Sequence, residues 1–341
     1  RLTDVIMVPA RNQHGASSGQ IGIAGIRLHP ELPLERREFH KPAVHDWRNP
    51  IVVDTVNQGY QGLRRGIRDS RFRHEEQDPD HVTAEVLYPS YFAMFGFQNT
   101  ELIEACFRNY NDWMANYCSA LPGRLYGLAL IPLYDPEAGA AELARVIKMG
   151  YRGACIPCTA PVGRPYRDAC YEPIWAMAEE AGIPLSLHVG TNSYVPAEYR
   201  QKQLTRDPIA DYTGAASSIQ RTLSELICQG VAHRRPALKF VVAEFNCGWI
   251  AHWLDRLDQG YVRSQQSASP DLDRRPSEYW RGQFYATLED DRAGILTREM
   301  IGVETLLWGN DYPHLDSTWP CSSDVRLEIL GDIPEADVLA M

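Results

Sequence analysis

The sequence has no long hydrophobic run and no excess of basic residues. Its longest apolar stretches, at residues 125–133 and 183–189, have the length of a β-strand and fall well short of the ~20 residues that span a bilayer. Acidic residues outnumber basic ones, 44 to 34, which gives a formal net charge of −10. Because nucleic acids and anionic membrane surfaces are recognised by basic patches, we expect neither as a partner.

A dinucleotide fingerprint and a disulfide framework are also missing. No G-x-G-x-x-G sequence occurs, which argues against a doubly wound nucleotide-binding sheet. The 8 cysteines are scattered through apolar segments, so we expect reduced thiols and a cytoplasmic location. Cys155 and Cys158 form a C-x-x-C pair with Pro157 between them. No second pair at metal-ligand spacing accompanies them, so we expect a structural role.

What the sequence does contain is a regular alternation of two kinds of segment. Hydrophobic residues make up 44% of the chain, enough for a sizeable core. From about Thr83, short aliphatic runs alternate with longer amphipathic ones, as in βα units on a parallel sheet. The predicted strands are residues 84–88, 126–131, 153–157, 184–189, 238–244, 283–288 and 305–311. The predicted helices are residues 100–120, 137–149, 171–181, 214–228, 248–260, 292–300 and 322–330.

Such a series of βα units favours a (β/α)8 barrel of the TIM type. We interpret the chain as a single α/β domain in which residues 1–82 form a loop-rich N-terminal excursion and residues 83–341 form the barrel body. Residues 1–75 show no clear helix. One barrel strand remains to be found. It is either the run VIMV at residues 5–8 or a segment upstream of Arg1.

Reactive side chains stand at the ends of three predicted strands, where parallel barrels carry their active sites. His188 lies at the end of 184–189, Glu244 ends 238–244 and Asp311 ends 305–311. A neutral imidazole and a carboxylate suit Zn²⁺ or a similar divalent ion, so His188 and Asp311 are candidate metal ligands. Each also has a structural alternative, a hydrogen-bonded core histidine for His188 and a helix cap for Asp311.

Glu244 and His314 are candidate acid/base residues. Glu244 follows the apolar run FVVA, where a carboxylate without a partner is costly to bury. It could act as a general acid or base, as a hydrogen-bond partner of a metal ligand, or in an ion pair with an arginine. His314, three residues after Asp311, is a candidate proton shuttle.

Several other side chains are assigned weaker roles. His252 is predicted to lie on the face of a helix. Tyrosine and tryptophan are plentiful, 17 and 8, which suits either an aromatic substrate or a homodimer interface. Candidate pocket contacts are Tyr60, Tyr88, Tyr194 and Arg164.

Together these segments resemble the amidohydrolase superfamily, in the branch similar to aminocarboxymuconate-semialdehyde decarboxylase. The resemblance covers about Thr83 to the C-terminus and is most specific in SLHVG and WGNDYPH. It implies a (β/α)8 barrel with one divalent metal, held by a His-x-His pair on the first strand, a histidine on the fifth and an aspartate on the eighth. His188 and Asp311 match the last two positions. Glu244 stands where decarboxylases of this branch have a histidine.

The His-x-His pair has no match, because no two of the 10 histidines are separated by a single residue. The resemblance nevertheless implies a metal-dependent decarboxylase or other C–C lyase, with a hydrolase as the nearest rival, acting on a small carboxylated or carbonyl-bearing molecule. In that hypothesis His188 and Asp311 help to hold the ion, and Glu244 or His314 transfers the proton. Two alternatives stay open: a metal-free barrel performing acid/base cyclisation or dehydration, and a catalytically inactive binding protein.

Overall fold

The computed structural model describes residues 64–89, 92–193, 208–264, 272–314 and 317–341. The strand expected at residues 5–8 and the pocket contacts Tyr60 and Tyr194 lie outside these ranges. Inside them, no helix combines the length and the apolar character needed to cross a bilayer.

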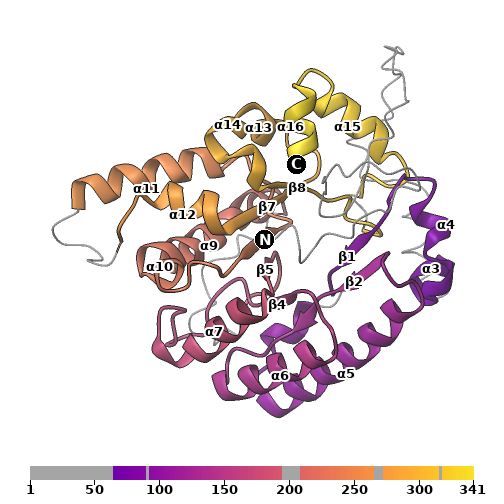
Figure 1. The fold of residues 1–341 in the computed structure, drawn as a ribbon, viewed down its shortest axis with the longest axis horizontal. Helices are drawn as coiled ribbons and strands as arrows, with labels where there is room; N and C mark the ends of the chain where they lie inside the picture. The colour runs from indigo at the N-terminus through magenta and orange to yellow at the C-terminus, as the bar shows by residue number, and fades with distance from the viewer. Residues whose placement is uncertain (1–63, 90–91, 194–207, 265–271, 315–316) are drawn as a thin grey trace.

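All the described strands pair in parallel and in chain order (Figure 1). β1 (Glu85–Leu87) pairs with β2 (Leu125–Gly127), and β3 (Ala129–Leu130) begins a sheet that continues through β8. The remaining strands are β4 (Ala154–Ile156), β5 (Leu185–His188), β6 (Phe240–Ala243), β7 (Phe284–Leu288) and β8 (Leu306–Trp308).

Every predicted strand is therefore present, with small changes at the ends. The predicted strand at 126–131 is divided between β2 and β3 at Leu128, whose N–H donates to the Leu87 carbonyl at 3.0 Å. Among the described residues, no strand joins the free edges of β8 and β1.

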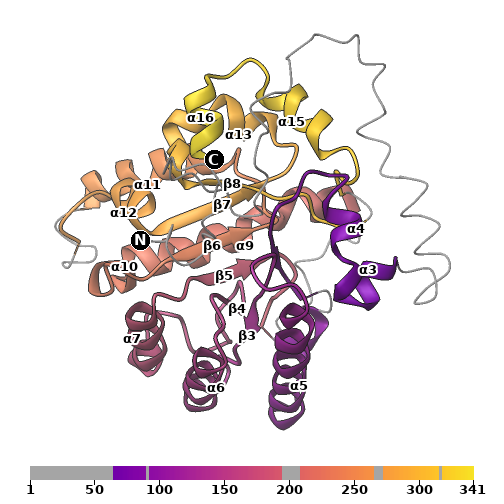
Figure 2. The ribbon, with the colours of Figure 1, turned by 45° about the vertical axis from the view of Figure 1, so that its right-hand side comes forward.

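Helices cover the outside of the strands. Figure 2 shows α5 (Thr100–Ser119), α6 (Pro136–Lys148) and α7 (Glu172–Ala181) in a row on one side. The other long helices are α9 (Pro208–Cys228), α11 (Ile250–Ser264), α12 (Pro276–Gln283) and α15 (Ser322–Leu330). The short ones are α3 (Arg65–Arg68), α4 (His74–Gln77), α10 (Val231–Arg234), α13 (Arg292–Leu296), α14 (Arg298–Ile301) and α16 (Glu335–Ala340).

The helices α10, α12 and α16 were not predicted, and other helices differ from the prediction in their bounds. The expectation of no clear helix before residue 75 is wrong for residues 64–75, since α3 and the start of α4 lie there. α9 begins at Pro208 rather than 214, because proline is well suited to a first helical turn. The helix expected at 292–300 is two short helices, because Thr297 leaves helical geometry at φ −108° and its hydroxyl bonds back to the Ala293 carbonyl at 2.8 Å.

Local sequence fixes the ends of several other helices. The Asn99 side chain accepts the Leu102 N–H at 2.9 Å and caps α5. Asp135 accepts the Glu137 N–H at 2.9 Å, and Pro136 begins α6. Gly182 ends α7 in the left-handed conformation, at φ 65°.

A layer of buried aromatic rings fastens the helices to the sheet. Trp280 of α12 stacks on Phe284 of β7 at 5.8 Å between ring centroids, and Phe284 stacks on Phe240 of β6 at 5.1 Å. Trp175 of α7 contacts Phe240 edge-on at 6.1 Å. This close packing makes β6 and β7 a rigid support for the residues that follow them.

Candidate functional site

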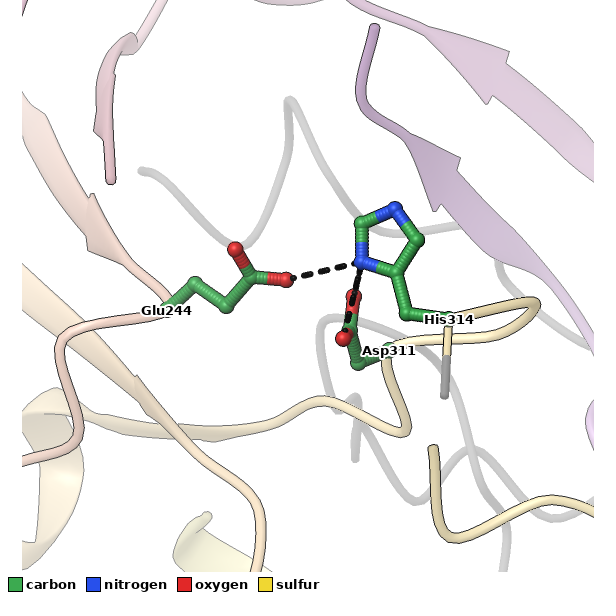
Figure 3. Close-up of side chains that lie close together, drawn as sticks. All are labelled: Glu244, Asp311 and His314. Atoms are coloured by element: carbon green, nitrogen blue, oxygen red, sulfur yellow. Dashed lines mark hydrogen bonds and ion pairs between the residues drawn. The ribbon is translucent and has the colours of Figure 1, made fainter. Parts of the chain in front are cut away.

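The four candidate catalytic residues meet at the carboxyl ends of β5, β6 and β8. His188 is the last residue of β5, and Glu244 follows β6 directly. Asp311 and His314 lie in the segment after β8. Figure 3 shows the side chains of Glu244, Asp311 and His314 pointing toward one another.

Glu244 is the centre of this cluster. Its Oε2 lies 3.3 Å from His188 Nε2, and its Oε1 lies 3.5 Å from His314 Nδ1. His314 Nδ1 is also 2.8 Å from Asp311 Oδ1. Glu244 therefore pairs with two imidazoles and not with an arginine, as one alternative had proposed. Its carboxylate connects residues that follow or end β5, β6 and β8.

Unusual backbone geometry aims the two carboxylates. Glu244, Asn246 and Asp311 have φ values of 63°, 53° and 50°, in the left-handed region that residues other than glycine seldom adopt. Each such residue costs about 1–3 kcal/mol and persists only where its surroundings hold it. The Glu244 N–H donates to Thr287 Oγ1 at 2.9 Å, which fixes the turn against β7.

His188 presents one ring nitrogen to the cluster. Its Nδ1–H donates to the Val189 carbonyl at 2.7 Å, because a carbonyl can only accept, and the Nε2 lone pair therefore faces Glu244. Burial lowers the pKa of His188, which favours this neutral form. The Tyr88 ring lies 4.9 Å from the imidazole, and its hydroxyl is 3.0 Å from Ser186 Oγ. Tyr88 is thus a neighbour of the site, as predicted.

The other three groups share protons. Burial raises the pKa of Asp311 to about 9, and Glu244 acts in the same direction. Burial also acts to raise the pKa of Glu244, but hydrogen bonds from His314 and Asp311 and the charge of His314 outweigh it and lower that pKa to about 2. Hydrogen bonds to Asp311 and Glu244 raise the pKa of His314 to about 10. An ionised Asp311 stabilises the protonated form of His314. The raised pKa values of Asp311 and His314 therefore describe one proton that lies between these two residues, whereas Glu244 is ionised.

The same atoms suit a divalent metal ion. Ligand atoms from Glu244, Asp311 and His314 all lie within 4.8 Å of one another. Two ligands of one tetrahedral ion, each at ~2.1 Å, would lie about 3.4 Å apart. The 3.3 Å between His188 Nε2 and Glu244 Oε2 matches that spacing. The imidazole and carboxylate donors therefore fit Zn²⁺ or Mn²⁺.

The remaining predicted residues lie apart from this cluster. Arg164 lines a cavity of 370 Å³ together with Phe95, Phe97 and Ser193, and none of the four cluster side chains is among its lining residues. Exposed His252 lies on α11, as expected.

The 8 cysteines form no disulfide in the described structure. Cys155 and Cys158 are both buried. Burial raises the pKa of the Cys158 thiol to about 12, and its Sγ donates to Asn192 Oδ1 at 3.4 Å. Such a thiol is neither a nucleophile nor a metal ligand at neutral pH.

Two supporting carboxylates were missed in the sequence. Asp291 Oδ2 accepts the N–H groups of Cys247 and Gly248, both at 2.6 Å, and so anchors the loop that begins at Glu244. Asp80 bonds to the segment after β8. Asp291 lies in the segment after β7, as Asp311 lies in the segment after β8. The partners of Asp80 are more than 200 positions away, so no local signal marks Asp80.

A parallel α/β fold with acid/base and metal-donor side chains at the strand ends defines a barrel enzyme class. Residues 66–340 match the amidohydrolase family model, and the chain belongs to that family. A solved 5-carboxyvanillate decarboxylase from Sphingomonas paucimobilis is 27% identical with a TM-score of 0.62, covering 79% of this chain and 78% of its own. The expected family and TIM-barrel class are confirmed.

Two further relatives bear on the chemistry. Gamma-resorcylate decarboxylase from Polaromonas is 25% identical over 219 residues, 60% of this chain, and the match spans only 65% of that relative. A 5-carboxyvanillate decarboxylase from Novosphingobium aromaticivorans, solved with manganese and 4-hydroxy-3-methoxy-5-nitrobenzoic acid, has a TM-score of 0.64 at 21% identity, covering 79% of this chain and 76% of its own.

Proposed function

We propose that this protein is a divalent-metal-dependent decarboxylase of small hydroxylated aromatic carboxylates. The observation that carries the proposal is the position of the Glu244 carboxylate, 3.3 Å from one imidazole and 3.5 Å from a second that is also bonded to Asp311. The decarboxylases among the relatives act on aromatic carboxylates, by their names, which supports the reaction and the substrate class.

In this proposal His188 and Asp311 are metal ligands, as inferred from the sequence, and Glu244 lies within reach of the same ion. When bound, the ion would polarise the oxygens of the substrate and fix its orientation. Zinc is expected from the donor types, whereas a relative carries manganese, so both ions need to be measured. Tyr88 packs against the His188 ring and restricts its rotation.

His314 supplies the proton. Hydrogen bonds to the Asp311 and Glu244 carboxylates hold this proton on the imidazole at neutral pH, and we infer that it passes to the ring carbon that bears the carboxylate. The bond between that carbon and the carboxylate then breaks, carbon dioxide leaves, and the bonding electron pair restores the aromatic ring. Water returns the proton to His314. Ionised Glu244 holds His314 in position throughout.

The setting of the enzyme follows from its thiols. Since all 8 cysteines are free, we place the enzyme in a reducing compartment, the cytoplasm. Its partner in the proposal is a small-molecule substrate.

Metal content and turnover of the full chain test the proposal. We expect about one Zn²⁺ or Mn²⁺ per chain by elemental analysis. We also expect carbon dioxide release from a panel of ortho-hydroxybenzoates, lost on chelation and restored by metal. His188→Ala and Asp311→Ala should lose the metal.

The matched control is His252→Ala, because this histidine is exposed on α11 away from the cluster. It should keep the metal and the activity. Turnover that survives removal of all metal would overturn the metal-dependent mechanism in favour of acid/base chemistry. Metal binding without turnover of any tested carboxylate, amide or lactone would favour a binding protein.

A further inference from the structure

A buried aspartate outside the cluster holds the segment that carries Asp311. Asp80, only 1% exposed, follows α4 in the chain. Its Oδ1 accepts the Ser322 N–H at 3.0 Å, and its Oδ2 accepts the Ser322 hydroxyl at 2.6 Å. Its Oδ2 also accepts the Asn310 Nδ2–H at 3.1 Å. One of the three donors belongs to Asn310, near the start of the segment between β8 and α15, and the other two belong to Ser322, at the end of that segment.

Asn310 passes this restraint to the cluster. Its side-chain Oδ1 accepts the Tyr312 N–H at 3.3 Å, so one amide side chain joins Asp80 to the residue after Asp311. Its carbonyl accepts the Ser317 hydroxyl at 2.6 Å. Asp311 lies between these bonds with its φ of 50°, a strained conformation that needs such support.

A neighbouring element shows what helix capping alone looks like. Asp258 accepts the Ser277 N–H at 3.0 Å and the Ser277 hydroxyl at 2.7 Å, the same pair of bonds that Asp80 makes with Ser322. Ser277 is the second residue of α12, and Ser322 is the first residue of α15. The bond to Asn310 distinguishes Asp80 from Asp258.

We propose that Asp80 is a positioning residue of the active site, which holds Asn310 and Ser322 and thereby fixes the orientation of the Asp311 carboxylate. A second contact between the same segments, from Trp319 Nε1–H to the Glu76 carbonyl at 2.9 Å, holds the segment alongside α4. The inference rests on the proposed function only insofar as Asp311 binds metal.

The test compares Asp80→Asn with Asp258→Asn. The amide at position 80 places an NH₂ group against two donors, from Asn310 and Ser322, whereas the amide at position 258 disturbs only the cap of α12. Removal of a group that orients a metal ligand typically costs 10–100-fold in affinity, so we expect Asp80→Asn to weaken Mn²⁺ binding by about that factor. We expect Asp258→Asn to bind Mn²⁺ within about twofold of the wild type.

A second measurement does not depend on metal. In the metal-free protein, the backbone amide signals of Asp311 and Tyr312 should shift in Asp80→Asn and stay in place in Asp258→Asn. The double variant Asp80→Asn/Asn310→Asp exchanges the two side chains, so that an amide donor again lies opposite a carboxylate acceptor. It should recover most of the Mn²⁺ affinity and the wild-type amide signals. If Asp80→Asn does not fold, Asn310→Ala breaks the same link and leaves the cap of α15 intact.

Equal behaviour of Asp80→Asn and Asp258→Asn in both measurements would overturn the inference. Wild-type protein that binds neither Mn²⁺ nor Zn²⁺ would instead overturn the proposed function. In that case the amide signals still decide whether Asp80 positions Asp311.

Discussion

The proton on His314 gives the sharpest test of the site's electrostatics. In the metal-free wild type, the hydrogen bonds to Asp311 and Glu244 raise the pKa of His314 to about 10. Asp311→Asn keeps the shape of the side chain and removes the charge. We expect this change to lower the pKa of His314, because the hydrogen bond from His314 to Asp311, 2.8 Å long, is the main cause of the raised pKa.

The size of the effect follows from the geometry. Opposite charges about 4 Å apart attract by ~4 kcal/mol at an effective dielectric constant of 20, which corresponds to about 3 pKa units. The His314 side chain is 40% exposed, so solvent screening reduces this value. A fall of at least ~1.5 units in Asp311→Asn is the expected result.

The assay is an NMR titration of ring carbons in histidine-labelled, chelator-treated protein, with His314→Gln to assign the signal. A wild-type His314 that titrates near the ordinary value of 6.5 would refute the reasoning. His188 is the internal control, because burial lowers its pKa and it should stay neutral.

The same shift predicts how stability depends on pH. The pKa of His314 is higher in the folded state, so its stabilising contribution is complete below pH ~6.5 and is lost as the pH rises through about 10. The metal-free wild type should therefore lose stability across this window more steeply than His314→Gln. Thermal unfolding measured at several pH values checks the sign, and the opposite slope would contradict it.

Three further substitutions test the packing around the site. Tyr88→Ala should weaken Mn²⁺ binding about tenfold in a metal titration, because the neighbouring imidazole loses its packing, whereas Tyr88→Phe keeps the ring and the affinity. Arg73→Met leaves the buried Glu85 carboxylate, 2.8 Å away in the wild type, without its partner and should cost about 3–5 kcal/mol in urea unfolding. Trp280→Ala should cost about 3–5 kcal/mol as well, and exposed Trp113→Ala much less; equal losses would contradict the packing argument.

Much of the fold could be predicted because its signals are local. Apolar runs of strand length end at turns, and Pro136 and Gly182 mark helix ends through their own backbone preferences. The division of one strand at Leu128 and the break at Thr297 depend on hydrogen bonds that no single segment specifies. The boundary at residue 82 stays a prediction.

From the sequence, the site could be predicted only as a set of reactive residues at the ends of three strands. His188, Glu244 and Asp311 stood out because ionisable groups ended apolar runs, and parallel strands bring such ends together. That Glu244 would lie between two imidazoles depends on its left-handed backbone, which the sequence does not mark in a residue other than glycine. The role of Asp80 depends on a partner in a distant element.

The bonds from Asp80 to Ser322 join positions 242 apart in the chain. Contacts within one βα unit close short loops and form early, whereas a contact of this span must await the elements between its ends. During synthesis, a nascent chain ending before α15 already carries His188, Glu244 and the bond from Asn310 to Asp80, but it lacks the two bonds from Ser322 to Asp80. In the proposed function, tight metal capture therefore waits until α15 has been made, which keeps a partly folded barrel from trapping an ion in an incomplete site.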